Sequence, residues 1–169
     1  MKLHIGGKKP KEGWTILNAQ NLDYVDIVGD ITDLSQFQDE SIEAIYASHV
    51  LEHVRQKKVI ETLRGINRIL KKDGVFYFSV PDMDVLAKLF LSEQLNTEQK
   101  WSVMRMMFGG QIDEYDYHYV GWSFEFAKTF FGLAGFRTLE RVKSFNIFQD
   151  TSDFKSFGVQ ISLNLIVKK

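Results

Sequence analysis

The sequence has no cysteine among its 169 residues and only two prolines, Pro10 and Pro81. The lack of cysteine excludes disulfides, zinc–thiolate sites, iron–sulfur clusters and cysteine nucleophiles, and it is compatible with a reducing compartment. Net charge is also nearly absent, since 21 basic and 22 acidic residues leave a formal charge of −1. The chain therefore lacks the overall basic field that is typical of proteins that bind nucleic acid or anionic lipid.

Long apolar runs are missing as well. The run Leu3–Ile5 near the N-terminus stops at Gly6–Gly7, which makes it too short for the core of a signal peptide. No stretch approaches the roughly 18 uncharged apolar residues that a membrane helix needs. From these absences we predict a cytoplasmic protein with neither a membrane nor a nucleic acid as its partner.

What is present is typical of a globular domain with an unusual share of aromatic residues. Hydrophobic residues make up 44% of the chain and charged residues 25%, and the length favours one domain over residues 1–169. Fourteen residues are Phe, and many of them lie in the last third. A Phe-rich core explains them most simply, whereas the alternative is an aromatic surface for a substrate or a second subunit, which favours a homodimer.

Strand-like and helix-like segments alternate along the chain. Strands are expected at 3–5, 14–17, 24–28, 42–48, 75–80, 136–145 and 159–167, with helices from His49 (interrupted near residue 55) to 70 and at 84–95, 97–108 and 123–134. This order predicts the α/β class, with a Rossmann-like, doubly wound, mostly parallel sheet and an antiparallel C-terminal edge. Only Lys8–Gly13 separates the first two strands, so the first crossover helix is missing. Either that crossover is compressed or the two strands pair differently.

Two local signals set helix boundaries. Lys71–Gly74 is expected to end the helix before it, with Gly74 in the left-handed position that suits glycine. Ser123 is expected to cap the last helix, and Gly135 follows the end of that helix.

Polar or flexible residues follow the predicted parallel strands at their carboxyl ends, where open α/β sheets bind ligands. They are Gly6–Gly7, Asn18, Asp30, Ser48–His49 and Pro81–Asp82. Together these residues could surround a ligand the size of a nucleoside.

Four segments carry a resemblance to a known family, and the first two of them match one element of it. Residues 30–34 read DITDL and residues 37–53 read FQDESIEAIYASHVLEH, while residues 68–76 read RILKKDGVF and residues 133–136 read LAGF. These segments resemble, in order, the "D…L…F.D.SFD.I…HVLEH", "R-x-L-K-P-G-G" and "AGF" elements of small class I S-adenosylmethionine-dependent methyltransferases. The resemblance covers most of the chain and is densest over residues 25–82.

The resemblance implies S-adenosyl-L-methionine as cofactor and assigns residues to it. Asp30, with Ile31 beside it, would face the adenine, since a fixed carboxylate suits its amino group. Asn18 stands where the family usually has an acidic residue that binds the ribose hydroxyls, and an amide binds them without charge assistance. Gly6 and Gly7 would let the methionine moiety approach the backbone. Ser48 and His49 would lie beside the cofactor, with His49 near the sulfonium and counted among the catalytic residues.

The loop 109–122 mixes acids, tyrosines and one histidine, and it resembles the "G-G-Q…H…G" stretch of the same methyltransferases. A long loop of this kind is suited to be a lid or an acceptor pocket. His118 could serve as the catalytic base for an acceptor hydroxyl, because its ordinary pKa is near 6.5. A structural histidine held by loop carbonyls is the equal alternative.

Residues 49–53 also match the H-x-x-E-H pattern of inverted zinc peptidases. On a helix, His49 and His53 would share one face and could bind zinc with Glu52 nearby. No third ligand is spaced for a peptidase, so we expect no metal site.

The sequence therefore predicts methyl transfer from S-adenosylmethionine to a small-molecule or sugar acceptor. The alternative is a degenerate, non-catalytic relative that kept the fold and binds a ligand, because the first loop is short and Asn18 replaces an acid. A zinc hydrolase built on His49, Glu52 and His53 is a third and weaker alternative.

Overall fold

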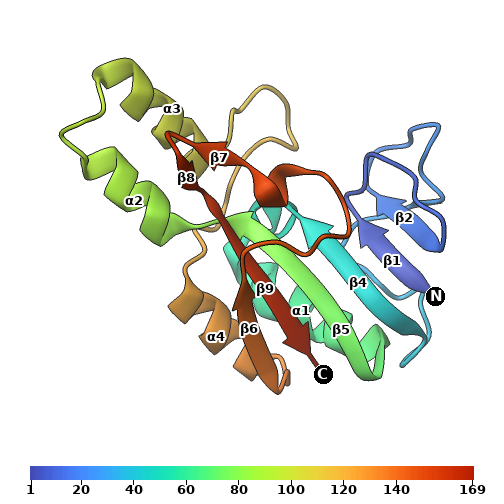
Figure 1. Ribbon diagram of the computed structural model, residues 1–169. Helices are drawn as coiled ribbons and strands as arrows, with labels where there is room; N and C mark the ends of the chain where they lie inside the picture. The colour runs from blue at the N-terminus through green and yellow to red at the C-terminus, as the bar shows by residue number, and fades with distance from the viewer.

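The computed structural model describes all 169 residues, and its centre is a seven-stranded sheet in the order β3-β2-β1-β4-β5-β9-β6 (Figure 1). The strands are β1 (Lys2–Ile5), β2 (Trp14–Asn18), β3 (Ile27–Val28), β4 (Ile42–Ser48), β5 (Leu70–Pro81), β6 (Thr138–Val142) and β9 (Ser162–Lys168). The neighbours from β3 to β5 pair in parallel, whereas β9 lies between β5 and β6 and is antiparallel to both. The predicted α/β fold, mostly parallel with an antiparallel C-terminal part, is confirmed.

The first crossover is compressed. Strand β1 pairs with β2 in parallel, from Lys2 opposite Trp14 to Ile5 opposite Leu17, although no helix connects them. This resolves the alternative that the sequence left open, since the first two strands do not pair differently. The strand order reverses between β1 and β4, which makes the gap above these two strands the switch point of the sheet.

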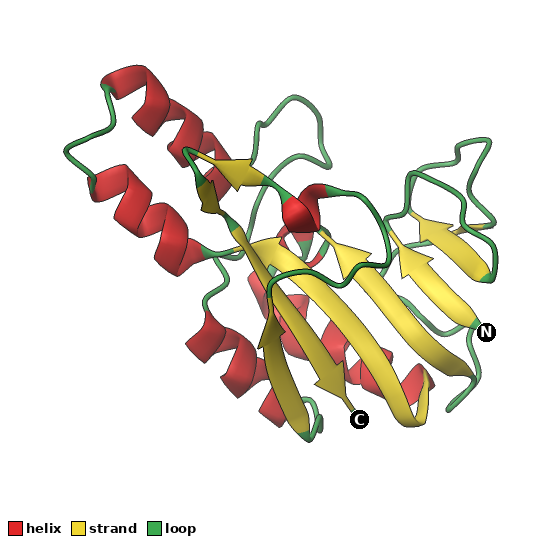
Figure 2. Cartoon of the chain, in the orientation of Figure 1, coloured by secondary structure: helices red, strands yellow, loops and turns green.

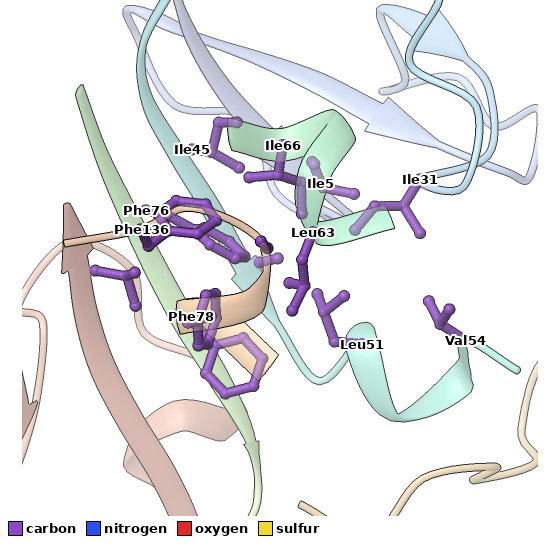
Figure 3. Packing of buried hydrophobic residues seen from close by; sticks show 14 of the residues in the cluster. Ile5, Ile31, Ile45, Leu51, Val54, Leu63, Ile66, Phe76, Phe78 and Phe136 are labelled. Atoms are coloured by element: carbon purple, nitrogen blue, oxygen red, sulfur yellow. The ribbon is translucent and has the colours of Figure 1, made fainter. Parts of the chain in front are cut away.

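One face of the sheet is covered by two helices, α1 (Val59–Ile69) and α4 (Phe124–Leu133), which lie behind the sheet in the view of Figure 2. Helix α1 forms because its apolar residues recur every three or four positions, which places Leu63 and Ile66 on one buried side. These side chains meet Ile45 and Phe76 from the sheet in the main core (Figure 3). The core contains 28 buried residues and extends from β1 to β9.

The opposite face is aromatic and is covered by a loop. Successive residues of a strand point to opposite faces, so His4 and Tyr46 face away from α1 while their neighbours face the core. Phe148 covers both, with ring centroids 4.1 Å from His4 and 4.7 Å from Tyr46. The covering loop, residues 143–154, includes the short helix η3 (Thr151–Asp153).

Two further helices, α2 (Met83–Leu91) and α3 (Thr97–Phe108), project from one end of the sheet (Figure 1). Asp82 caps α2 by accepting from Asp84 N, and Asn96 caps α3 in a reciprocal capping box with Gln99. A small hairpin, β7 (Lys155–Ser156) and β8 (Val159–Gln160), precedes β9. No helix of the structure is long and apolar enough to span a membrane.

Several predicted boundaries were wrong. Strand β3 covers only Ile27–Val28 instead of 24–28, because the Asp26 carboxylate accepts the Ile16 N–H and replaces strand pairing there. Strand β5 begins at Leu70, which pairs with Ile42 before a bulge, so the left-handed residue is Asp73 (φ 70°) and not Gly74. Helix α2 ends four residues early, and β6 is half as long as expected. The Ser123 cap is confirmed, since its side chain accepts from Phe126 N.

Candidate functional site

The site is a cleft of about 590 Å³ above the carboxyl ends of β1 to β4, at the switch point of the sheet. One wall is formed by the strand ends and the loops after them. The facing wall is the loop 109–122. The residues that line the cleft include Gly6, Asn18, Asp30, Ile31, His49 and His53.

Gly6 follows β1 and begins the compressed crossover. Its φ of +71° lies in the left-handed region, and an added Cβ would lie 2.5 Å from Val50 Cγ2, so only glycine fits there. Gly7 is buried and does not line the cleft, but its carbonyl accepts a bond of 3.3 Å from Asn18 Nδ2. An added Cβ on Gly7 would lie 2.7 Å from the His4 ring. Gly6 therefore borders the cleft, and Gly7 supports it from below.

Asn18 ends β2 with its side chain already bonded at both ends. Nδ2 donates to the Gly7 carbonyl, and Oδ1 accepts from Gln20 N at 3.0 Å. One amide N–H and one oxygen lone pair stay free. The amide is thus fixed in place at the cleft with half of its bonding capacity available.

Asp30 and Ile31 follow β3 and line the same cleft. Asp30 Oδ1 accepts from Thr32 N at 2.7 Å, which fixes the carboxylate at the start of a turn. Ile31 is 8% exposed and joins the main core, where Figure 3 shows it near Leu63 and Leu51. An acceptor carboxylate and an apolar surface therefore lie next to each other at this edge.

His49 follows β4 in the left-handed region, with φ 54°, a conformation uncommon for a residue with a side chain. Its Nε2 lies 3.0 Å from Ser162 Oγ, and Ser162 Oγ donates to the Thr151 carbonyl. The imidazole must then donate from Nε2, which leaves Nδ1 as an acceptor. Burial lowers the pKa of His49 to about 4, so the ring is neutral at neutral pH.

Glu52 lies directly below His49, with Oε1 3.4 Å from His49 Nδ1. The residue is 1% exposed, and neither carboxyl oxygen has a hydrogen-bond partner. Burial raises the pKa of Glu52 to about 8. A buried acid without partners is costly in either protonation state, and such groups gather at functional sites.

Loop 109–122 folds back on itself before it reaches the cleft. Gly109 has φ +85°, and an added Cβ would collide with the Asp116 carbonyl, so glycine permits this close return. The loop brings three carboxylates to the cleft, those of Asp113, Glu114 and Asp116. It also brings the Tyr119 ring, and the guanidinium carbon of Arg55 lies over that ring, 4.9 Å from its centroid. The loop predicted from its composition therefore forms the second wall.

Two other predicted residues lie away from the cleft. Ser48 is half-buried, its Oγ has no partner, and it is not a lining residue. His118 is also not a lining residue, but its ring centroid lies 4.9 Å from that of His53, which does line the cleft. Burial lowers the pKa of both histidines.

The helix that the H-x-x-E-H pattern requires does not form. Residues Leu51–His53 form one turn of 3-10 helix (η1), a second short one follows at Gln56–Lys58 (η2), and His49 lies outside both. The expected interruption near residue 55 is confirmed. His49 and His53 therefore do not share a helix face, and the histidine that approaches Glu52 and His53 is His118. His118 was a candidate site residue from the sequence, but no spacing rule predicts its approach to His53, because the two are 65 positions apart.

Arg55 and Lys8 also line the cleft and were missed by the sequence argument. Lys8 belongs to the short crossover Lys8–Gly13, which carries no family motif. Arg55 follows the H-x-x-E-H segment directly, and that adjacency was the signal available. Both are cations in a cleft that otherwise holds four carboxylates, namely Asp30 and the three of the loop.

Comparison with known proteins agrees with this geometry. Residues 11–78 match the family described as methyltransferase domain. A methyltransferase dependent on S-adenosylmethionine from Archaeoglobus fulgidus aligns with a TM-score of 0.62 and 13% identity, over 99% of this chain and 85% of that one. One from Thermotoga maritima gives 0.53 and 16%, over 99% and 81%.

The methyltransferase CalH, solved with SAH, aligns with a TM-score of 0.59 and 14% identity, over 99% of this chain and 50% of that one. No curated protein matches the sequence. The predicted resemblance is confirmed: the chain has the fold of the class I S-adenosylmethionine-dependent methyltransferases, and its residues 11–78 carry the pattern of the methyltransferase domain family.

Proposed function

We propose that residues 1–169 form one methyltransferase-like domain that transfers a methyl group from S-adenosyl-L-methionine to a small-molecule or sugar acceptor. One observation carries this proposal. A single cleft at the switch point brings Gly6, Asn18, Asp30 and His49 together from four different strand ends. The fold places ligands at that point, and the CalH structure with SAH belongs to the same fold.

The residues present fit the cofactor. A volume of about 590 Å³ lies in the range of small-molecule sites, roughly 300–1,000 Å³. Four carboxylates against two cations give the cleft a negative balance at neutral pH. S-adenosylmethionine carries a net positive charge through its sulfonium and ammonium groups, so the charges are complementary.

Within the cleft, Asp30 would accept from the adenine amino group while Ile31 packs against the ring. The free N–H and lone pair of Asn18 would bind the ribose hydroxyls, and Gly6, supported by Gly7, would leave room for the methionine moiety. The bound cofactor supplies an electrophilic methyl group. The protein then has to align the acceptor with that methyl group and exclude water.

The catalytic roles of His49 and His118 stay predictions, as does the cofactor contact of Ser48. His49 has its Nε2 bonded to Ser162 and its Nδ1 near Glu52, which suits a residue that orients the strand end. Turnover measured with His49→Gln and His118→Gln tests them. If a variant loses turnover but binds the cofactor with unchanged affinity, the histidine that it replaces acts as a catalytic base.

The proposal extends to the setting of the protein. We infer a cytoplasmic enzyme with no nucleic-acid or membrane partner, because the charge balance is close to zero. A homodimer is supported by large apolar side chains at the surface, among them Leu91 (76% exposed) and Trp101 (63%). Sedimentation of the purified chain tests the dimer.

Titration calorimetry with S-adenosylmethionine and with S-adenosylhomocysteine tests the cofactor. We expect binding of both, and we expect Asp30→Ala to weaken it about tenfold or more, the value of one hydrogen bond to a charged group. The control is Asp23→Ala, because Asp23 is an exposed acid outside the cleft. Absence of binding at millimolar ligand, or equal loss in both variants, contradicts the proposal.

A non-catalytic binding protein with the same fold is the second candidate. The observation in its favour is the compressed crossover, since residues 6–13 contain no helix whose N-terminus could bind the cofactor. Both ends of Asn18 are also engaged within the protein. This candidate predicts no binding of S-adenosylmethionine at millimolar ligand in calorimetry, and no transfer of a labelled methyl group to any hydroxyl, amine or sugar acceptor.

A further inference from the structure

Three side chains from two distant segments converge beneath the cleft. Glu52 and His53 come from η1, and His118 comes from the loop 109–122. One ligand atom from each lies within 4.8 Å of the others. An ion with bonds of about 2.1 Å needs ligand atoms roughly 3.4 Å apart, so small side-chain rotations would bring the three into contact with it.

Glu52 points to a missing partner. It is almost fully buried, and both of its carboxyl oxygens lack a hydrogen bond. The nearby His49 Nδ1, at 3.4 Å, does not satisfy either oxygen. Buried polar groups are normally hydrogen-bonded, and buried charges are paired or bound to a metal, so an ion in this position would supply the partner that the protein does not.

His53 is held in the form that binds metals. Its Nδ1 lies 3.1 Å from the Tyr117 carbonyl, to which it must donate, so Nε2 keeps its lone pair. Metal-bound histidines almost always donate their second N–H to a carbonyl or carboxylate in this way.

We propose that Glu52, His53 and His118 bind one divalent transition-metal ion of the zinc type, in a site separate from the cofactor positions. Two imidazoles and one carboxylate suit zinc, cobalt and iron(II) better than calcium or magnesium, which prefer oxygen ligands only. His53 also lines the cleft, so the proposed site borders it.

The ion needs no peptidase arrangement. His49 does not belong to the cluster, which consists of Glu52, His53 and His118. The site also does not depend on methyl transfer, since it is built from groups that are present whether or not a cofactor binds. Its failure and that of the proposed function are distinguishable, because calorimetry with S-adenosylmethionine reports only on the cofactor.

The test uses the full chain without a histidine tag, treated with a chelator and then titrated with Co²⁺. We expect one equivalent to bind, with the intense visible absorption of four-coordinate cobalt, and Zn²⁺ to displace it. The melting temperature should rise with Zn²⁺ concentration. His118→Ala and Glu52→Gln should each weaken binding at least tenfold.

The matched control is His4→Leu, which removes the one remaining histidine outside this region and should bind cobalt like the wild type. Melting of the metal-free variants shows whether each one folds, and Glu52→Gln keeps the volume of the buried side chain. Absence of stoichiometric cobalt binding overturns the proposal. Equal affinity in the wild type and in both ligand variants overturns it as well.

Discussion

The two faces of the sheet are built by different means. The face toward α1 and α4 is covered by helices and is mostly apolar, with Phe78 and Phe131 among its fully buried residues. The other face is covered by the loop 143–154, whose Phe148 packs on His4 and Tyr46. The helix that a longer first crossover would supply is absent, and a segment from the far end of the sequence takes its place.

The loop face is held by polar contacts that the helical face does not need. Tyr46 Oη donates to Asp150 at 2.8 Å, and Asn164 Nδ2 donates to the Ser152 carbonyl at 2.9 Å. Asn164 Oδ1 in turn accepts from Ser79 at 2.7 Å. A loop has no internal ladder of hydrogen bonds, so side chains from the sheet must fix its backbone. A loop can therefore cover the sheet in place of a helix if side chains of the sheet supply hydrogen bonds to the loop.

The largest expected effect lies on the helical face. Phe131→Ala removes a fully buried ring that contacts Phe76, Phe78 and Phe136, and it should lower the free energy of unfolding by about 3–5 kcal/mol. Urea denaturation followed by circular dichroism measures this value. The control is Phe126→Ala on the same helix, where the side chain is 53% exposed and the expected loss is below about 1 kcal/mol. Similar losses in both variants would show that α4 is not anchored through its buried side.

The helical face could be predicted from the sequence, and the loop face could not. The spacing of apolar residues predicts helix α1 and strand β4. The ends of the predicted strands in turn identify Gly6, Asn18, Asp30 and His49 as site residues. Phe148 lies in a loop, where no helical or strand periodicity predicts which residues it contacts. The approach of His118 to His53 is likewise a long-range contact of a loop. The strand-end residues and loop 109–122 of the site were thus predictable, whereas the long-range side-chain contacts of the loops were not.

The second effect is the share of the pH dependence that His4 contributes on the loop face. Burial lowers the pKa of His4 to about 4, from an ordinary value of 6.5, against a smaller opposing effect of Asp150. The unfolded chain then binds more protons between these values, so the stability is fully present above pH 6.5 and is lost as the pH falls toward 4. For His4 this loss amounts to about 3 kcal/mol over that window.

The measurement is the free energy of unfolding against pH for the wild type and for His4→Leu. The difference between the two curves isolates His4, because His49 and Glu52 titrate equally in both proteins. As the pH falls from 6.5 to 4, we expect the free energy of unfolding of His4→Leu to rise by about 3 kcal/mol relative to that of the wild type. Parallel curves would mean that the histidine is solvated when it is protonated, and the loop would then not seal this face.

A third, smaller effect tests the loop as a cover. Phe148→Ala removes a half-buried ring that contacts His4, Tyr46 and Trp14, and it should cost about 1–2 kcal/mol. Water would then reach His4, so its pKa should rise toward the ordinary value and the acid sensitivity should shrink. The pKa of His4 followed by NMR measures this. If the stability falls by about 1–2 kcal/mol but the pKa of His4 does not change, Phe148 stabilises the loop by packing and does not keep water from His4.

The smallest effect concerns the polar contacts that replace a helix. Tyr46→Phe removes the hydroxyl that bonds Asp150 at 2.8 Å and Ser152 at 3.3 Å, while the buried ring stays in place. Asp150 is only half-buried, so water can bind its freed oxygen, and the loss should be about 1 kcal/mol. Hydrogen exchange of the Ser152 amide, which donates to Asp150 at 2.8 Å, should quicken while the exchange of α1 stays unchanged. If α1 were to exchange faster as well, the two faces would unfold as one unit, and the loop would be as integral to the fold as a helix.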